Sequence, residues 1–265
     1  MQGDKAPATS PLFETIRDEG VDFVRRLNRM TDAVTGHFFH RIKTVAADRQ
    51  VLNLIYRLRS KFLCSFLVLN PGSHLDEETV EKQQMYLHHV DHLMKDPSLS
   101  EAEMQELRLT KFYLLFALQK DRPTSEGDAA LFLLMTDIKN TPASVKGEAS
   151  IEQDVLRLYH ELLDQRKEVL TQDPSGFANA VFKLLDREAP VDEVRCEVGV
   201  GGSTISAVSG GIRWDFRLSD LSVFYDGKRM ESKNPLFHPN HAFLKLFGND
   251  SLEGKIKAGE HLLFT

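Results

Sequence analysis

Apolar residues recur at steps of three and four between positions 51 and 69, and this period constrains the fold more than any other feature of the chain. Such a period places the residues on one face of an α-helix, whereas a half-buried strand would show alternation. The face comprises Val51, Leu54, Ile55, Leu58, Phe62, Phe66 and Leu69. Leu63 and Leu67 add a second apolar face, which predicts a helix enclosed by others, with the first face in the core. The apolar run 62–69 is too short to cross a bilayer, which takes about 20 residues.

Turn and capping signals divide the first 190 residues into further helices. The helix over 51–69 is expected to end at Asn70-Pro71-Gly72. Ser73, Ser100 and Ser150 each stand three residues before an acid or glutamine, which is typical of helix starts because the serine oxygen accepts a backbone N–H there. We predict helices over 76–95, 101–120, 126–139, 151–171 and 176–187, with one or two more between Arg17 and His40. These lengths and short joints are typical of helical bundles.

The pattern changes after Pro190. Val194, Cys196, Val198 and Val200 alternate with other residues, and glycine-rich stretches follow. Asp226-Gly227 beside an apolar run is a hairpin signal. The predicted fold class is therefore mainly α, with helical bundles over residues 10–188 and a smaller strand-containing C-terminal part, α+β overall. Three units are expected: 1–95 (N-terminal helical), 96–189 (middle helical) and 190–265 (C-terminal, strand-rich).

One predicted strand, Arg213-Trp214-Asp215-Phe216-Arg217, alternates aromatic and charged side chains. Such an arrangement could stack the bases of single-stranded nucleic acid between arginines. A lone tryptophan on a strand is more often part of the core, with the charged residues facing water. We expect the aromatic rings to be buried.

The net charge of −6 conceals two oppositely charged stretches. Between Arg25 and Lys61 nine basic residues stand against two acids, and between Asn70 and Thr110 nine acids stand against three basic residues. Charge runs are commonly solvated surface, but a basic run also favours contact with polyanions such as anionic lipid. Some of the arginines are expected to pair with the acidic stretch.

The sequence contains no motif for phosphate binding or acyl transfer. The glycines of GVGGSTISAVSGG match neither a P-loop nor a dinucleotide fingerprint, and the nucleophile elbow GxSxG is missing. Cys64 lies in an apolar run and is expected to be a buried, inert thiol. The two cysteines fit no paired motif and favour a reducing compartment, and residues 1–30 lack the apolar core of a signal peptide. We expect a protein that is not an enzyme and holds no cofactor.

Three histidines, His88, His89 and His92, cluster on one predicted helix. His88 and His92 share a face and could hold zinc with a third ligand, but the general-base glutamate of HExxH is absent, so no metal is assigned. The other interpretations are a pH-sensing cluster and ordinary surface histidines. As a sensor, the cluster would become charged between about pH 5 and 7, with Asp91 and Glu81 raising its pKa, and acid would then loosen self-association.

Four stretches, in the same order, resemble the matrix proteins of orthomyxoviruses. SPLFETI is similar to the N-terminal helix of that family, and RSKFLCSFLVLNPGS is similar to its apolar helix with a proline turn. LHHVDHLMKDPSLSEAEMQELRLTKFYLLFAL parallels a helix, polar loop and helix. SEGDAALFLLMTDIKNTPASVKGEASIEQDVLRLYHEL resembles the small-residue helix, linker and long helix that follow. The likeness covers roughly residues 10–170, and the acidic pI of about 5.9 favours the thogotovirus branch.

The chain also departs from the family. The family's basic helix motif falls near residues 107–111, where only Arg108 and Lys111 are charged. The Cys/His cluster of influenza matrix protein has no counterpart, and the part after Pro190 does not resemble influenza's helical C-terminal part. The usual place of nucleic-acid contact therefore does not carry over to this chain.

The resemblance implies a viral structural protein that self-assembles beneath the envelope and bridges the anionic membrane to ribonucleoprotein. Its partners would be further copies of itself, anionic lipid, viral ribonucleoprotein or nucleoprotein, and the tails of envelope glycoproteins. Acidic faces would meet basic faces of neighbouring copies, a contact that produces open arrays. It would be located in the virion, in the host cytoplasm, at the inner plasma membrane and in the nucleus.

The basic N-terminal third is expected to face lipid, since each Lys or Arg near an anionic leaflet contributes about 1 kcal/mol. The candidate membrane- or polyanion-binding residues are Arg25, Arg26, Arg29, Arg57, Arg59 and Lys61. Two alternatives stay open. One is a cytosolic helical adaptor or effector that binds a protein partner through the same faces, and the other is a His-ligated metal hydrolase.

Overall fold

A computed structural model describes residues 11–38, 46–141, 149–185, 191–200 and 202–230. Within these ranges seven α-helices precede five β-strands, which confirms a mainly α chain with a smaller strand-containing part. The helices are α1 (Pro11–Phe38), α2 (Ala46–Leu69), α3 (Glu77–Leu93), α4 (Glu101–Asp121), α5 (Ser125–Asn140), α6 (Ala149–Gln172) and α7 (Pro174–Leu184). Each predicted helix is present, with ends that differ by a few residues.

Of the three serine caps read from the sequence, the structure confirms the one at Ser100. Ser100 and Glu103 form a complete capping box at α4, in which each side chain bonds the other residue's backbone N–H. Asp76, not Ser73, caps α3, because its carboxylate accepts the Thr79 backbone N–H at 2.8 Å. The side chain of Ser150 lies outside the described residues.

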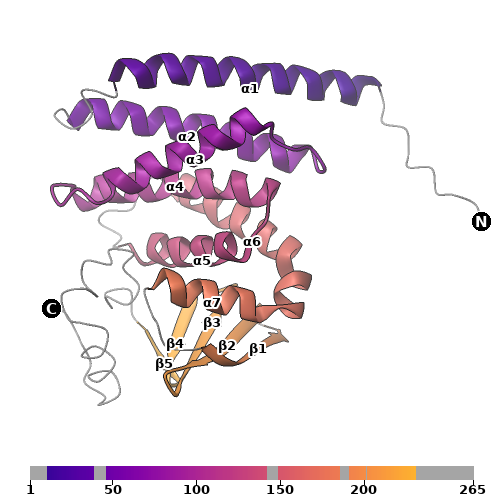
Figure 1. Ribbon diagram of the computed structural model, residues 1–265, viewed down its shortest axis with the longest axis vertical. Coiled ribbons are helices and arrows are strands. Elements are labelled where there is room, and N and C mark those ends of the chain that lie inside the picture. Colours follow the sequence, from indigo (N-terminus) through magenta and orange to yellow (C-terminus); the bar gives the residue numbers. More distant parts are fainter. Residues whose placement is uncertain (1–10, 39–45, 142–148, 186–190, 201, 231–265) are drawn as a thin grey trace, which may run out of the picture.

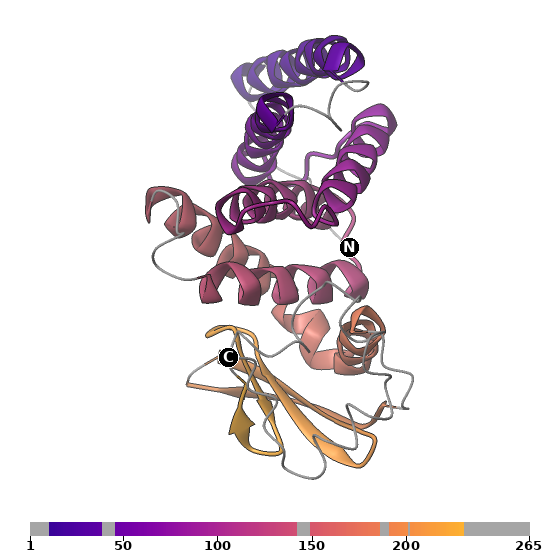
Figure 2. The ribbon, with the colours of Figure 1, turned by 90° about the vertical axis from the view of Figure 1, so that its left-hand side faces the viewer.

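The elements are stacked along the long axis of the molecule (Figures 1 and 2). Helix α1 forms one end, the sheet forms the other, and the remaining helices lie between them. One apolar cluster extends through this stack, from Val24 in α1 through Phe112 in α4 and Phe132 in α5 to Trp214 in the sheet. The cluster contains residues of all three expected units, and the division at residues 95 and 189 stays a prediction.

The sheet is antiparallel in the order β1-β2-β3-β4-β5. Its strands are β1 (Val191–Gly199), β2 (Gly202–Ser209), β3 (Ile212–Arg217), β4 (Ser222–Tyr225) and β5 (Lys228–Arg229). Asp226 and Gly227 both have positive φ, as the predicted two-residue hairpin requires. Trp214 and Phe216 lie on the face that packs against α7, where both rings meet Phe182 edge-on at 5.7 Å. The expectation that these rings belong to the core is confirmed.

Helix α2 corrects the expectation drawn from its apolar period. The buried face is the second one, which carries Leu52, Tyr56, Arg59, Leu63 and Leu67. The face beginning at Val51 is largely exposed, Leu58 to 59% and Leu69 to 75%, and of its seven members only Phe66 is buried.

Small and polar residues explain which face of α2 turns inward. Cys64 is fully buried, and its Sγ lies 3.2 Å from the Tyr113 carbonyl oxygen, so α4 approaches closely. Larger side chains would hold the two helices apart. Burial raises the pKa of the Cys64 thiol, and the prediction of a buried thiol is confirmed.

Candidate interaction surfaces

The outward side of α1 carries an arginine face, defined as Arg25, Arg26 and Arg29. Helix α1 packs on α2 and α3 through Val24, Asn28 and Thr31, which leaves the three arginines exposed at the end of the molecule (Figure 1). Arg25 lies 3.6 Å from Asp22, a surface ion pair of little energetic weight. Neither Arg26 nor Arg29 forms an ion pair with any residue that the structure describes. These guanidinium groups are therefore available to an anionic partner.

Arg57 and Lys61 are engaged with acids of neighbouring helices. Arg57 forms an ion pair with Glu106 of α4, and Lys61 lies 3.3 Å from Asp154 of α6. Together with the Arg49–Asp96 pair (2.7 Å), these contacts pair three of the nine basic residues of the stretch with acids of the same molecule. The expectation that some of the basic residues pair with the acidic stretch is confirmed.

Arg59 corrects the set of expected membrane contacts, because it is 1% exposed and cannot reach lipid. Its Nε and Nη2 donate to the Asn28 side-chain oxygen at 2.9 and 2.6 Å, and Nη1 donates to Gln83 Oε1. The guanidinium carbon lies 5.0 Å from the Tyr86 ring centroid. Arg59 therefore ties α1, α2 and α3 together.

Burial lowers the pKa of Arg59 from its ordinary value, whereas Tyr86 and Asp32 act in the opposite direction. Asp32 in turn accepts from the Tyr86 hydroxyl at 3.1 Å and pairs with Lys82. Asn28 also donates to the Thr79 hydroxyl at 3.0 Å. The contact between α1 and its neighbours is thus largely polar, and it was missed from the sequence, because Arg59 was expected to face lipid.

A second surface, the apolar stripe, runs along one flank of α1 and α2. It is defined as Phe23, Met30, Val51, Leu54 and Leu58, which are exposed, with the half-buried Ile55 and Phe62. The rings of Phe23 and Phe62 lie 4.5 Å apart, so the two helices contribute to one continuous surface. The sequence placed the α2 members in the core and missed Phe23 and Met30, although their spacing of seven residues on α1 was a usable signal.

The histidine cluster differs from the expectation in its electrostatics. His88 and His92 are exposed, whereas His89 is half-buried and its Nδ1 shares a 3.0 Å hydrogen bond with the Tyr56 hydroxyl. Burial, together with His88 and His92, lowers the pKa of His89. The predicted rise of the pKa is therefore wrong for His89, and Asp91 pairs instead with Lys111 at 2.6 Å. Among the described residues, no group of three or more potential ligands is placed to hold a metal ion.

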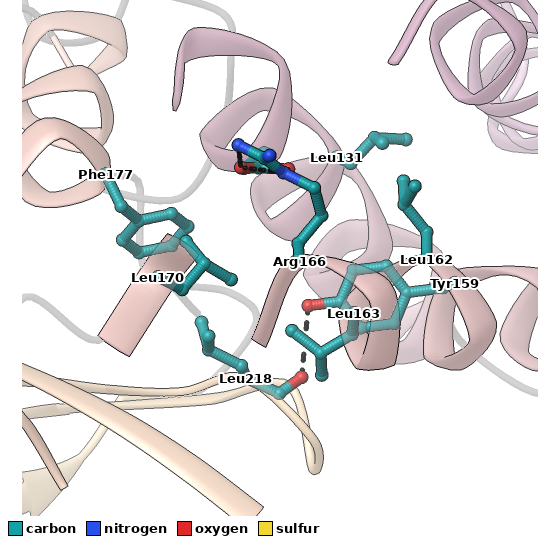
Figure 3. A pocket seen from close by; sticks show the side chains of 9 residues that line it. Leu131, Tyr159, Leu162, Leu163, Arg166, Leu170, Phe177 and Leu218 are labelled. Atoms are coloured by element: carbon teal, nitrogen blue, oxygen red, sulfur yellow. Dashed lines mark hydrogen bonds and ion pairs between the residues drawn. The ribbon is translucent and has the colours of Figure 1, made fainter. Parts of the chain in front are cut away.

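A small hollow of about 280 Å³, which includes space open to solvent, lies where α5, α6 and α7 meet the sheet (Figure 3). Its polar groups satisfy one another: Arg166 donates to both carboxylate oxygens of Asp128, and the Tyr159 hydroxyl donates to the Leu218 carbonyl at 3.1 Å. The rest of the lining is leucine and phenylalanine. This arrangement stabilises the junction of the three helices with the sheet.

No protein-family model, curated protein or solved structure matches this chain. None of the described helices combines the length and the apolar character that crossing a bilayer would require.

Proposed function

We propose that this chain is a structural protein of the matrix type, similar to the matrix proteins of orthomyxoviruses, which lines an anionic membrane as a self-associating layer. The observation that carries the proposal is the arginine face at one end of an elongated molecule, where Arg26 and Arg29 have no ion-pair partner among the described residues. An anionic leaflet attracts such an end-on basic surface and would orient the long axis away from the membrane.

The energetics favour a layer over single bound copies. Three arginines contribute on the order of 3 kcal/mol near an anionic leaflet, which corresponds to weak attachment of one molecule. Linking copies raises the effective affinity, because each further contact becomes intramolecular. Membrane binding and self-association therefore depend on each other in this proposal, and the sheet end would face ribonucleoprotein.

Vesicle flotation tests the proposal. Full-length protein with the charge reversals Arg25→Glu and Arg29→Glu is compared with Lys228→Glu and Arg229→Glu, a matched pair of exposed basic residues in β5 at the sheet end. On vesicles containing phosphatidylserine, we expect wild type and the β5 variant to float and the α1 variant to remain at the bottom. Added salt should weaken flotation, since exposed charges are screened within about 8 Å at physiological ionic strength.

Equal flotation of both variants would refute the role of the arginine face. Absence of wild-type flotation at low salt would refute membrane attachment and favour the alternative, a helical adaptor that binds a protein partner through the same face. Negative-stain images separate these two functions further: coats on anionic vesicles support a matrix layer, and monomers beside bare vesicles support the adaptor.

A further inference from the structure

We infer that the apolar stripe on α1 and α2 is the contact between two copies of this chain, stripe against stripe. The inference rests on the proposed function in one respect, because the lateral orientation of the stripe is read relative to a membrane at the arginine face. Everything else in it follows from the exposure and the position of the stripe.

The large apolar side chains of the stripe are exposed to solvent. Met30 is 66% exposed and Leu58 is 59% exposed, and both lie within one surface that also includes Phe23, Val51 and Leu54. The largest apolar patch on a typical monomer covers about 300–600 Å² and is often a binding site. The mostly half-exposed side chains of the stripe offer roughly 500 Å² per copy, since a complete large side chain provides about 150–250 Å².

The position of the stripe selects the occupant. Leu58 lies on the side of α2 opposite Tyr56, whose ring stacks on Tyr86 of α3 at 4.3 Å. The stripe therefore points sideways from the stack of helices. On α1, Arg29 points about 100° away from Met30, whereas Arg26 is only about 40° from Met30, so the arginine face adjoins the stripe along Arg26. With the arginine face on a membrane, the stripe meets the flank of a neighbouring copy at the same height.

The chemistry of the stripe suits a pair of identical surfaces. A two-fold contact places the same patch on both copies, and the members of the stripe carry no charge that their own image would repel; Arg26 and Lys61 lie at its edges. Two copies would bury roughly 1,000 Å² in total, which is the size of a weak, reversible interface. Because a two-fold contact closes, it joins copies into reversible pairs, and a layer needs a second, heterologous contact between the pairs.

Sedimentation of the full chain in solution tests the inference without any membrane. We expect a monomer–dimer equilibrium for wild type, and at least a tenfold higher dissociation constant for Leu58→Glu. Two valines provide a matched comparison: Val51 in the stripe is 42% exposed and Val169 in α6 is 43% exposed. Val51→Glu should weaken the dimer, whereas Val169→Glu should not. At protein concentrations low enough for every variant and the wild type to be monomeric, all should melt at the same temperature, because each change is at an exposed side chain.

If something other than a second copy covers the apolar stripe, the same variants give different results. A wild-type dimer that Leu58→Glu and Val51→Glu leave intact would overturn the inference. If those variants lose flotation but not dimerisation, lipid covers the stripe and the inference is also wrong. A chain that stays monomeric at all concentrations overturns it as well. A dimer that depends on the stripe in a protein that does not float would support this contact and refute the membrane function, so the two failures are distinguishable.

Discussion

Arg59→Ala should destabilise the protein strongly and act on folding, not on membrane contact. The change removes a fully buried guanidinium that makes three hydrogen bonds to Asn28 and Gln83. The two amide oxygens then lack these donors, and a buried unsatisfied polar group costs about 1–3 kcal/mol. Lost packing of the arginine stem and the contact with Tyr86 add to this, whereas relief from burying a charge offsets part of it.

The sum is on the order of 3–5 kcal/mol, a large share of the 5–15 kcal/mol that typically separates folded from unfolded chains. Urea unfolding followed by circular dichroism measures the loss. Arg29→Ala serves as the matched control, because this exposed arginine lies on α1 without an ion pair to a described residue and should change stability by less than about 0.5 kcal/mol. Asn28→Ala combined with Arg59→Ala should cost less than the sum of the two single changes, since both remove one shared contact.

The reasoning would be refuted by an Arg59→Ala protein that unfolds at the wild-type urea concentration. It would also be refuted if the variant kept its stability but lost vesicle flotation, because Arg59 would then act at the surface. Arg59→Met helps to interpret a partial effect: methionine fills some of the volume without a buried charge, and it should lose less stability than alanine does.

Three further predictions concern the core and two titratable groups. Phe66→Ala should lower the unfolding free energy by about 3 kcal/mol or more and Leu69→Ala by less than 0.5, because Phe66 is buried and Leu69 is 75% exposed; equal melting curves would contradict this. Because the pKa of His89 is lowered in the folded protein, the unfolded chain binds a proton more readily. The free energy of unfolding should therefore fall as the pH drops below about 6.5. His89→Gln should reduce this fall, measured as the change in the urea midpoint between pH 7.5 and 5.5. Asp137 should give the opposite pH dependence of stability. Burial raises its pKa to about 7, so the stability that its neutral form contributes is lost as the pH rises towards 7. Asp137→Asn should therefore be more stable than wild type at pH 7.5 but not at pH 4. An unchanged pH profile in either variant would assign the dependence to other groups.

The sequence by itself determined the existence and type of the elements. The helical period, the serine cap at Ser100 and the Asp226-Gly227 turn are local signals, and each depends on residues only a few positions apart. For that reason α4, whose capping box is complete, began at the predicted residue Glu101. The burial of Trp214 was also predictable, because an alternating strand offers only one face to a core.

Only the tertiary structure decided which face of α2 is buried. Both faces of α2 carry apolar residues at helical spacing. The periodicity therefore could not show whether the face with Val51 and Leu58 or the face with Leu52 and Leu63 is buried. The choice depends on α1, α3 and α4: Asn28 and Gln83 supply the acceptors that allow Arg59 to be buried, and Cys64 lets α4 approach. Asn28 and Gln83, the partners of Arg59, and Tyr113, the partner of Cys64, lie 24 to 49 positions away from these residues in the sequence. A local pattern shows that a residue can be buried, but the polar groups that make its burial favourable come from distant segments of the chain. For this reason the exposure of the apolar stripe and the burial of Arg59 could be determined only from the tertiary packing.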